Sequence, residues 1–280
     1  MIDPIWLGIF GWPAAHSKSP QMHEAAARAL GIELRYERFE VPPEGLTDAV
    51  AEKHADGIDG YNLTVPHKQA IIALLDDLAS SARVIGAVNT VVRAGDRYVG
   101  HNTDAPGLVR SLQEANVELK EARAVVLGAG GAARAAVVGL SEAGASGVTV
   151  LSRRLEQGQA LVESLRAHLE CELNAASLGH AARYFAAATV LVQATSATLG
   201  SNPSADDFAK SLPMEALPAN AAVLDMVYEP LKTRVLERAE ARGLQIVDGL
   251  GMLLHQGAIA FEMWTGFEPP LDVMRAALVG

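Results

Sequence analysis

Cysteine and positive charge are both scarce in this sequence. Its 280 residues include one cysteine, Cys171, so no disulfide can form within the chain and a cysteine-rich structural zinc site is excluded. A single thiol is typical of a reducing compartment, and we expect a cytoplasmic protein. Lysine and arginine number 23 against 33 aspartates and glutamates, and the net charge of -10 disfavours nucleic acid and anionic membranes as partners.

Long hydrophobic runs are also missing. No stretch reaches the roughly 18 apolar residues of a membrane span, and Met1–Phe10 lacks the cationic start of a secretory signal. Hydrophobic residues nevertheless make up 50% of the chain, which is too much for a disordered protein. At about 150 residues per domain, the length predicts two domains, each large enough to bury a core.

A strand, a glycine turn and a helix follow one another in the middle of the chain. The apolar run Ala124–Leu127 leads into Gly128–Ala133 and then into an alanine-rich helical stretch. A second strand at Val148–Leu151, a helix at Glu156–His168 and further apolar runs continue the alternation as far as Val247. This alternation predicts an α/β fold with a Rossmann-type, doubly wound parallel sheet covered on both faces.

The first hundred residues predict a second α/β unit without a glycine turn. The expected elements are strands at Trp6–Phe10 and Leu34–Val41, helices at Pro20–Leu30, Gly45–His54 and His67–Leu75, and a hairpin of Ala87–Arg93 with Tyr98–Gly100. We therefore predict an N-terminal substrate-binding and catalytic domain over 1–105 and a Rossmann domain over 106–249. The segment 250–280 is expected to pack back on the first domain.

The glycine turn matches a dinucleotide-binding pattern. Gly128, Gly130 and Ala133 occupy the three small positions of G-x-G-x-x-G/A, which allow a tight bend, close approach to a pyrophosphate and close helix packing. The helix start then offers free N–H groups to phosphate. A plain strand-to-helix connection is the alternative, but the strand before the turn and the helix after it favour dinucleotide binding.

The tip of the second strand indicates which dinucleotide binds. An NAD enzyme places an acidic residue there for the ribose hydroxyls, whereas this chain has Ser152, Arg153 and Arg154. Guanidinium groups can form charge-assisted bonds to a 2′-phosphate, so we predict NADP, with Arg153 nearer the strand end. The alternative is that both arginines are simply solvated. The missing acid also disfavours an S-adenosylmethionine enzyme.

Two serines precede the first predicted helix. Ser17 and Ser19 stand between a strand and the helix that begins at Pro20. Hydroxyls in this position suit a carboxylate ligand, but Ser19 would equally serve as a helix cap. Both interpretations stay open at this point.

Further polar segments of the first unit also suggest a site. Asn62 and Thr64 are two residues apart and therefore share one face of a strand. Lys68 would lie in the first turn of the helix expected at His67–Leu75, where a cation opposes the helix dipole, and this unfavourable placement hints at an acid or base. A solvated lysine is the alternative. Asn89 and Asp104 follow in two other polar segments and could face the same ligand.

Seven segments together resemble the shikimate dehydrogenase family. They occur in that family's order and cover the chain nearly from end to end. They are HSKSP (16–20), GYNLTVPHK (60–68), GAVNT (86–90), GHNTDAPG (100–107), GAGGAARA (128–135), DMVYEPLKT (225–233) and GMLLHQ to WTG (251–266).

The resemblance implies an NADPH-dependent, reversible reduction of 3-dehydroshikimate to shikimate in aromatic amino acid (chorismate) biosynthesis. It implies Lys68 and Asp104 as the catalytic pair, and which of them carries the working proton stays open. For the substrate it implies Ser17 and Ser19 at the carboxylate, Asn62, Thr64, Asn89 and Gln256 at the ring hydroxyls, and Tyr228 nearby. For NADP it implies Gly128, Ala129, Gly130, Gly131, Ala132, Ser152, Arg153, Arg154, Thr195, Ser196, Met226 and Gly249.

Two segments depart from the family's pattern. Glu24 follows His23, where the family often has asparagine. The family's Asn-Ala-Thr-Ser-x-Gly segment near the nicotinamide is here Gln193–Gly200, with the glycine displaced by two residues. The second departure lies in the segment that the resemblance assigns to the nicotinamide.

Two other functions remain as alternatives. A broader quinate/shikimate dehydrogenase would share nearly every motif, but its cofactor is often NAD, which Arg153 disfavours. A non-catalytic regulator that binds NADP or another ligand would not need Lys68 and Asp104 together. The eight histidines do not form an H-E-x-x-H motif, so we expect no metal. We expect the protein to be a monomer or a homodimer.

Overall fold

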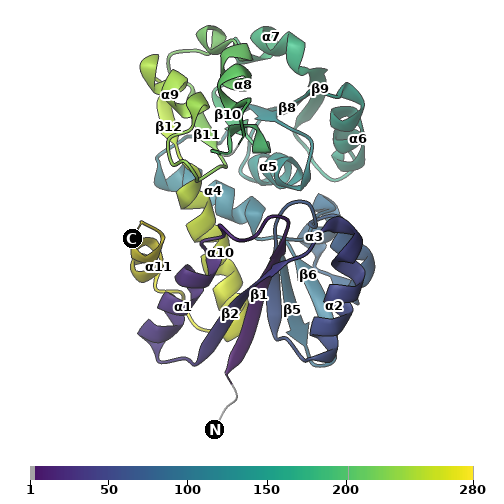
Figure 1. Cartoon of the computed structure of the whole chain (residues 1–280). Coiled ribbons are helices and arrows are strands. Elements are labelled where there is room, and N and C mark those ends of the chain that lie inside the picture. The colour runs from purple at the N-terminus through teal and green to yellow at the C-terminus, as the bar shows by residue number, and fades with distance from the viewer. Residues whose placement is uncertain (1–3, 201, 280) are drawn as a thin grey trace. The chain divides into compact units, whose positions relative to one another are not determined.

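Two six-stranded sheets organise the chain. The computed structural model describes residues 4–200 and 202–279, which form two compact units (Figure 1). Unit 1 comprises the described residues up to Thr103 and those from Gln256 onward, and unit 2 lies within Asp104–His255. These divisions fall a few residues from the domain limits expected at 105 and 249. The expected domains also include residues 1–3 and 280, which lie outside the described residues.

The sheet of unit 1 is mixed. Its strand order is β2-β1-β3-β5-β6-β4, with β1 parallel to β2 and β3, whereas β5 is antiparallel to β3 and β6. The strands are β1 Ile5–Gly11, β2 Leu34–Glu40, β3 Gly60–Leu63, β4 Asp77–Leu78, β5 Thr90–Ala94 and β6 Arg97–His101. The helices include α1 Ser19–Leu30, α2 Leu46–Ala55 and α3 Ser80–Ile85. Phe10, Tyr61 and Ile58 lie in the buried core.

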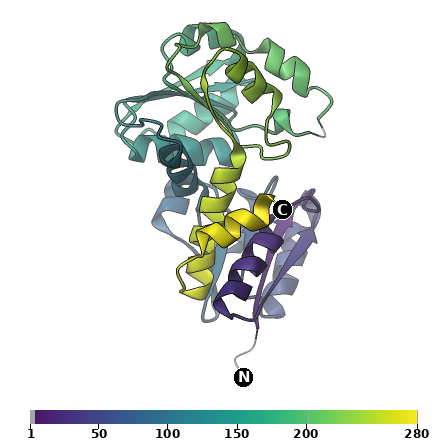
Figure 2. The same cartoon turned by 90° about the vertical axis from the view of Figure 1, so that its left-hand side faces the viewer.

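The C-terminal segment completes unit 1. Helix α10 (Gly249–Thr265) contains the division between the units, and α11 (Leu271–Val279) lies against α1 (Figure 2). Lys18 Nζ donates to the Leu278 carbonyl at 2.7 Å, and Trp264 Nε1 donates to the Val91 carbonyl at 2.9 Å. These bonds attach both ends of the segment to unit 1.

The sheet of unit 2 is entirely parallel. Its order is β12-β11-β10-β7-β8-β9, and each neighbouring pair is parallel. In chain order the elements are α4 Asp104–Glu114, β7 Arg123–Leu127, α5 Gly131–Glu142, β8 Gly147–Ser152, α6 Leu155–Leu165, β9 Glu172–Ser177, α7 Ala181–Phe185, β10 Val190–Gln193, α8 Ala205–Ser211, β11 Ala222–Asp225, α9 Arg234–Ala241 and β12 Gln245–Val247 (Figure 1).

Alternate residues of these strands bury opposite faces of the sheet. Val125 and Leu127 belong to an apolar cluster that also contains Phe185 of α7 and Leu236 of α9.

The strand order reverses between β7 and β10, and the carboxyl ends of parallel strands at such a reversal are where ligands bind. The predicted fold class, a two-domain α/β protein with a Rossmann-type parallel sheet, is therefore confirmed.

The structure differs from the expected elements at His67–Leu75 and at β9. The helix expected over His67–Leu75 is wrong, because only Ala70–Leu74 forms a short 3-10 helix. The Lys68 carbonyl accepts the N–H of Val88 at 2.7 Å and so is not left for a helical partner in its own segment. Strand β9 was not expected, because its sequence is short and rich in alanine and polar residues.

Candidate functional site

A buried amide holds the polar groups of unit 1 together. Asn89 is 2% exposed, and its Nδ2 donates to Thr103 Oγ1 at 2.8 Å and to Gln256 Oε1 at 3.2 Å. Its Oδ1 accepts the backbone N–H of Thr103 at 2.7 Å. One side chain thus joins the segment before β5, the segment after β6 and helix α10.

A second buried amide extends this network toward α1. Asn62 on β3 donates from Nδ2 to the Asn89 carbonyl and to Thr90 Oγ1, both at 3.0 Å. The Tyr36 hydroxyl donates to Asn62 Oδ1 at 2.7 Å, and the Ser19 side chain lies near the same hydroxyl. Burial raises the pKa of Tyr36 well above its usual value, so the hydroxyl keeps its proton and remains a donor.

The Tyr36 ring packs against the buried ring of His23. The His23 ring stacks on the Tyr36 ring, with centroids 4.9 Å apart and planes 8° from parallel. Burial lowers the pKa of His23 to about 3, so the imidazole is neutral at pH 7. It therefore fixes the orientation of Tyr36 without adding charge to the network.

The two serines lie in the loop and first turn that follow β1. Ser19 is the first residue of α1 and Lys18 is the N-cap, so the capping alternative for Ser19 is wrong, and its hydroxyl lies near Tyr36 instead. Ser17 Oγ accepts the Ser19 N–H at 3.3 Å, and Arg38 Nη2 donates to the Ser17 carbonyl at 2.7 Å. The loop is thereby held in place by β2.

Thr64 lies beside this loop. It follows β3, and its N–H donates to the Phe10 carbonyl at 2.9 Å. A Cβ on Gly11 would come within 2.3 Å of Thr64 Cγ2, so the glycine lets the two segments approach. The predicted substrate residues of unit 1 thus gather at the carboxyl ends of β1 and β3.

Lys68 and Asp104 belong to different units. Lys68 is partly buried in the turn before the 3-10 helix, so the expected opposition to a helix dipole is wrong. Asp104 begins α4 in unit 2, is 3% exposed and directly follows Thr103. Tyr228, also in unit 2, is partly buried after β11.

The glycine turn of unit 2 leaves space for a ligand. Gly128 has φ +114°, and a Cβ there would lie 2.8 Å from Thr195 Cγ2, so glycine is required by both conformation and packing. At Gly130, by contrast, a Cβ would meet no described atom within 4 Å. This open position lies at the N-cap of α5, where N–H groups and the helix dipole favour an anion. The turn therefore fits a pyrophosphate.

The other predicted cofactor residues lie at neighbouring strand ends. Ser152 ends β8, and its hydroxyl donates to the Arg154 carbonyl at 2.8 Å, while Arg153 is exposed. Gly249 approaches Met226 so closely that a Cβ would be 2.6 Å from the Met226 carbonyl oxygen. Ala129, Gly131 and Ala132 lie in or directly after the glycine turn, and Thr195 and Ser196 follow β10.

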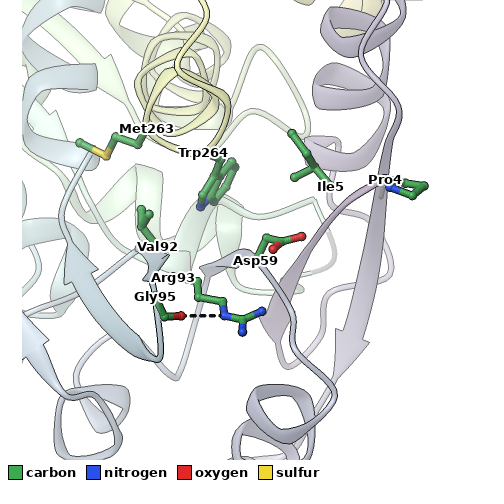
Figure 3. A pocket seen from close by; sticks show the side chains of 8 residues that line it. All are labelled: Pro4, Ile5, Asp59, Val92, Arg93, Gly95, Met263 and Trp264. Carbon is green, nitrogen blue, oxygen red and sulfur yellow. Dashed lines mark hydrogen bonds between the residues drawn. The ribbon is translucent and has the colours of Figure 1, made fainter. Parts of the chain in front are cut away.

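Unit 1 has a hollow of about 490 Å³ whose lining includes none of the predicted site residues (Figure 3). Asp59 in it accepts the Trp6 N–H at 2.8 Å, and Arg93 Nε donates to the Gly95 carbonyl at 3.0 Å. The lining residues are Pro4, Ile5, Asp59, Val92, Arg93, Gly95, Met263 and Trp264. Ile5 begins β1, whereas the serine loop follows its end, so the hollow is separate from the predicted site.

The described residues form neither a metal site nor a membrane span. Among residues 4–200 and 202–279, no three His, Cys, Asp or Glu side chains gather as a metal site would require. None of the described helices is long and apolar enough to cross a membrane.

Sequence reasoning missed several members of the network. Thr90 and Thr103 stand inside the polar segments singled out from the sequence, so those segments carried a signal for them. Tyr36 and Arg38 carried none, because an aromatic and a charged residue in a predicted strand are unremarkable until the neighbouring strand is known.

Models of known families match most of the chain. The shikimate dehydrogenase substrate binding domain matches residues 9–91, the shikimate/quinate 5-dehydrogenase model matches 110–202, and the shikimate 5′-dehydrogenase C-terminal domain matches 249–279. Shikimate dehydrogenase (NADP(+)) of Symbiobacterium thermophilum is 45% identical over 277 residues, covering 97% of this chain and 92% of that protein.

Solved structures are also similar over nearly the whole length. Shikimate 5-dehydrogenase of Thermus thermophilus, in complex with NADP(H) and shikimate, is 40% identical with a TM-score of 0.83 and 98% coverage of each chain. Quinate dehydrogenase of Corynebacterium glutamicum, in complex with NAD, is 31% identical with a TM-score of 0.88 and 99% coverage of each chain.

Removing the Tyr36 hydroxyl tests the network. Tyr36→Phe leaves the buried Asn62 Oδ1 without this donor, and we expect the free energy of unfolding to fall by about 1–3 kcal/mol in chemical denaturation. Tyr184→Phe, on a partly exposed residue of α7, is the control and should change stability by less than about 0.5 kcal/mol. Equal effects of the two substitutions would contradict the network's role.

Proposed function

This chain belongs to the shikimate/quinate dehydrogenase family and is an NADP-dependent shikimate dehydrogenase, and from this premise we propose which residues carry out the reaction. The enzyme interconverts 3-dehydroshikimate and shikimate. NADPH supplies the hydride that reduces the ketone carbon of 3-dehydroshikimate. The protein must therefore hold the ring, stabilise the charge that develops on the ketone oxygen and deliver a proton there.

Most of the proposed substrate-binding residues belong to unit 1. The hydroxyls of Ser17 and Ser19 hold the carboxylate, and the ring hydroxyls bind Asn62, Thr64, Asn89 and Gln256, with Tyr228 nearby. The observation that supports this most is the network around Asn89, because it fixes the amides of Asn62, Asn89 and Gln256 relative to one another. Side chains oriented in advance bind a substrate at a smaller entropic cost.

Lys68 and Asp104 are the proposed catalytic pair. The Lys68 ammonium stabilises the developing alkoxide and donates a proton to it, and Asp104 accepts a hydrogen bond from a neighbouring hydroxyl and orients the amine. Support comes from a short path of contacts: the Lys68 carbonyl binds the Val88 N–H, and the adjacent Asn89 binds the Thr103 N–H. Asp104 is the next residue along the chain.

NADP binds to unit 2 in this proposal. The N–H groups at the start of α5 and the open position at Gly130 receive the pyrophosphate, and Arg153 pairs with the 2′-phosphate. Hydride transfer between NADP and a ring carbon does not require a metal, and we propose none. We further propose a cytoplasmic enzyme that acts as a monomer or a homodimer.

Replacing Lys68 tests the catalytic pair. We expect Lys68→Ala to lower kcat for shikimate oxidation by about 100-fold while the affinity for NADP+, measured by calorimetry, stays near that of the wild type. The loss follows because no amine remains to accept the proton of the hydroxyl that is oxidised, which is the reverse of the proton donation proposed for the reduction. Lys210→Ala, on an exposed lysine of α8, is the control and should keep the wild-type kcat. An unchanged kcat in Lys68→Ala would remove Lys68 from the mechanism.

Replacing Arg153 tests the choice of cofactor. Arg153→Ser should raise KM for NADP+ about tenfold or more, because it removes a charge-assisted bond to the 2′-phosphate, and leave KM for NAD+ unchanged. Arg166→Ser, on an exposed arginine just after α6, is the control. An equal rise of KM for both cofactors would contradict the proposed role.

Turnover of quinate with NAD+ alone by the wild type would favour the broader quinate/shikimate alternative.

A further inference from the structure

A buried carboxylate lies where two strands of the parallel sheet end. Asp225, the last residue of β11, is 0% exposed. Its Oδ1 accepts hydrogen bonds from Gln193 Nε2 at 3.2 Å, Thr198 Oγ1 at 3.1 Å and the Val227 N–H at 3.0 Å. Its Oδ2 accepts one from Thr233 Oγ1 at 2.7 Å. Burial raises the pKa of Asp225, while these four donors act in the opposite direction.

The four donors named here are all uncharged. A buried carboxylate that is held by neutral donors is costly compared with an apolar side chain of similar size. What such a cluster provides is geometry, because each donor must keep its position for the carboxylate to remain satisfied. The segments that supply the donors are therefore held rigidly against one another.

Gln193 connects this carboxylate to the loop 194–200. It is the last residue of β10 and lies opposite Asp225 in the strand register. Its Nε2 also donates to Thr198 Oγ1 at 2.8 Å, and its Oε1 accepts the N–H and the hydroxyl of Thr195, both at 2.7 Å. An asparagine is one methylene shorter and could not keep all of these contacts. The far end of the loop is fixed by the Gly200 N–H, which donates to the Glu229 carbonyl at 3.1 Å.

The same loop lies against the glycine turn. Gly128 is so close to Thr195 that a Cβ would lie 2.8 Å from the threonine methyl group. In the sheet, β7 has β8 on one side and β10 on the other. The proposed 2′-phosphate residue, Arg153, follows β8, so the adenosine half of NADP extends to that side. The nicotinamide half of a dinucleotide that crosses the turn must then extend over β10 and β11.

We propose that Gln193, Thr198 and Asp225 are positioning residues that set the height and angle of the nicotinamide ring through the loop 194–200. This inference rests on the proposed NADP site in unit 2. The three side chains do not touch the reacting atoms, and they act through the backbone of the loop. The network gives a physical reason for glutamine at 193, where the family's segment begins with asparagine.

Two substitutions test this role. Gln193→Asn shortens the amide, and Thr198→Val removes one hydroxyl with little change in shape. In both variants we expect kcat at saturating cofactor to fall by about tenfold, because a displaced ring is poorly aligned with the substrate. The fluorescence emission of bound NADPH, which reports on the reduced ring itself, should shift toward that of free NADPH. The dissociation constant of adenosine 2′,5′-bisphosphate, which lacks nicotinamide, should stay within about twofold of the wild-type value.

Gln157→Asn, on an exposed residue of α6, is the matched control and should behave as the wild type in all three measurements. If Gln193→Asn fails to fold, Thr198→Val alone decides. Wild-type kcat and NADPH emission in the variants would overturn the inference. A loss of affinity for the bisphosphate as large as the fall in kcat would also overturn it, because the network would then stabilise the whole of unit 2 and not the nicotinamide loop in particular. A wild-type protein that does not bind the bisphosphate would overturn the proposed NADP site and this inference with it.

Discussion

The hydrogen bonds of one buried amide, Asn89, determine the arrangement of the proposed substrate-binding groups of unit 1. Asn89 holds Thr103 at both the backbone and the hydroxyl, and it holds Gln256 of α10. The backbone carbonyl of Asn89 accepts a hydrogen bond from Asn62 Nδ2. Segments distant in sequence thus meet at one side chain, and an amide is suited to this because it donates and accepts at once. Loss of this side chain would release Gln256 and the residue before Asp104 together.

In unit 2 the parallel strand topology, and not one buried side chain, brings the candidate cofactor residues together. Its strands are parallel, so every loop after a strand emerges at the same edge of the sheet, and short side chains near β7, β10 and β11 become neighbours without long-range design. Glycine is required where backbones approach closely, as at Gly128 against Thr195 and at Gly249 against Met226. Buried polar groups such as Asp225 then fix the loops that the parallel topology has brought together.

The sequence predicted the fold class and the two α/β units because hydrophobic periodicity and the glycine turn are local signals. It predicted the helix at His67–Leu75 wrongly because the Lys68 carbonyl is used by Val88, a partner that no local pattern reveals. Tyr36 shows the same limit, since its importance depends on Asn62 and Ser19 on other elements. The family motifs indicated the proposed site residues, but only the network explains why Thr90 and Thr103 accompany them.

The most direct test of this account is a crystal structure of the protein with shikimate and NADP+ bound. The account predicts that Lys68 Nζ and the Asp104 carboxylate both lie about 2.6–3.2 Å from hydroxyls at the reacting end of shikimate. A complex in which either group points away from that end, or in which another side chain takes its place, would contradict the proposed catalytic pair.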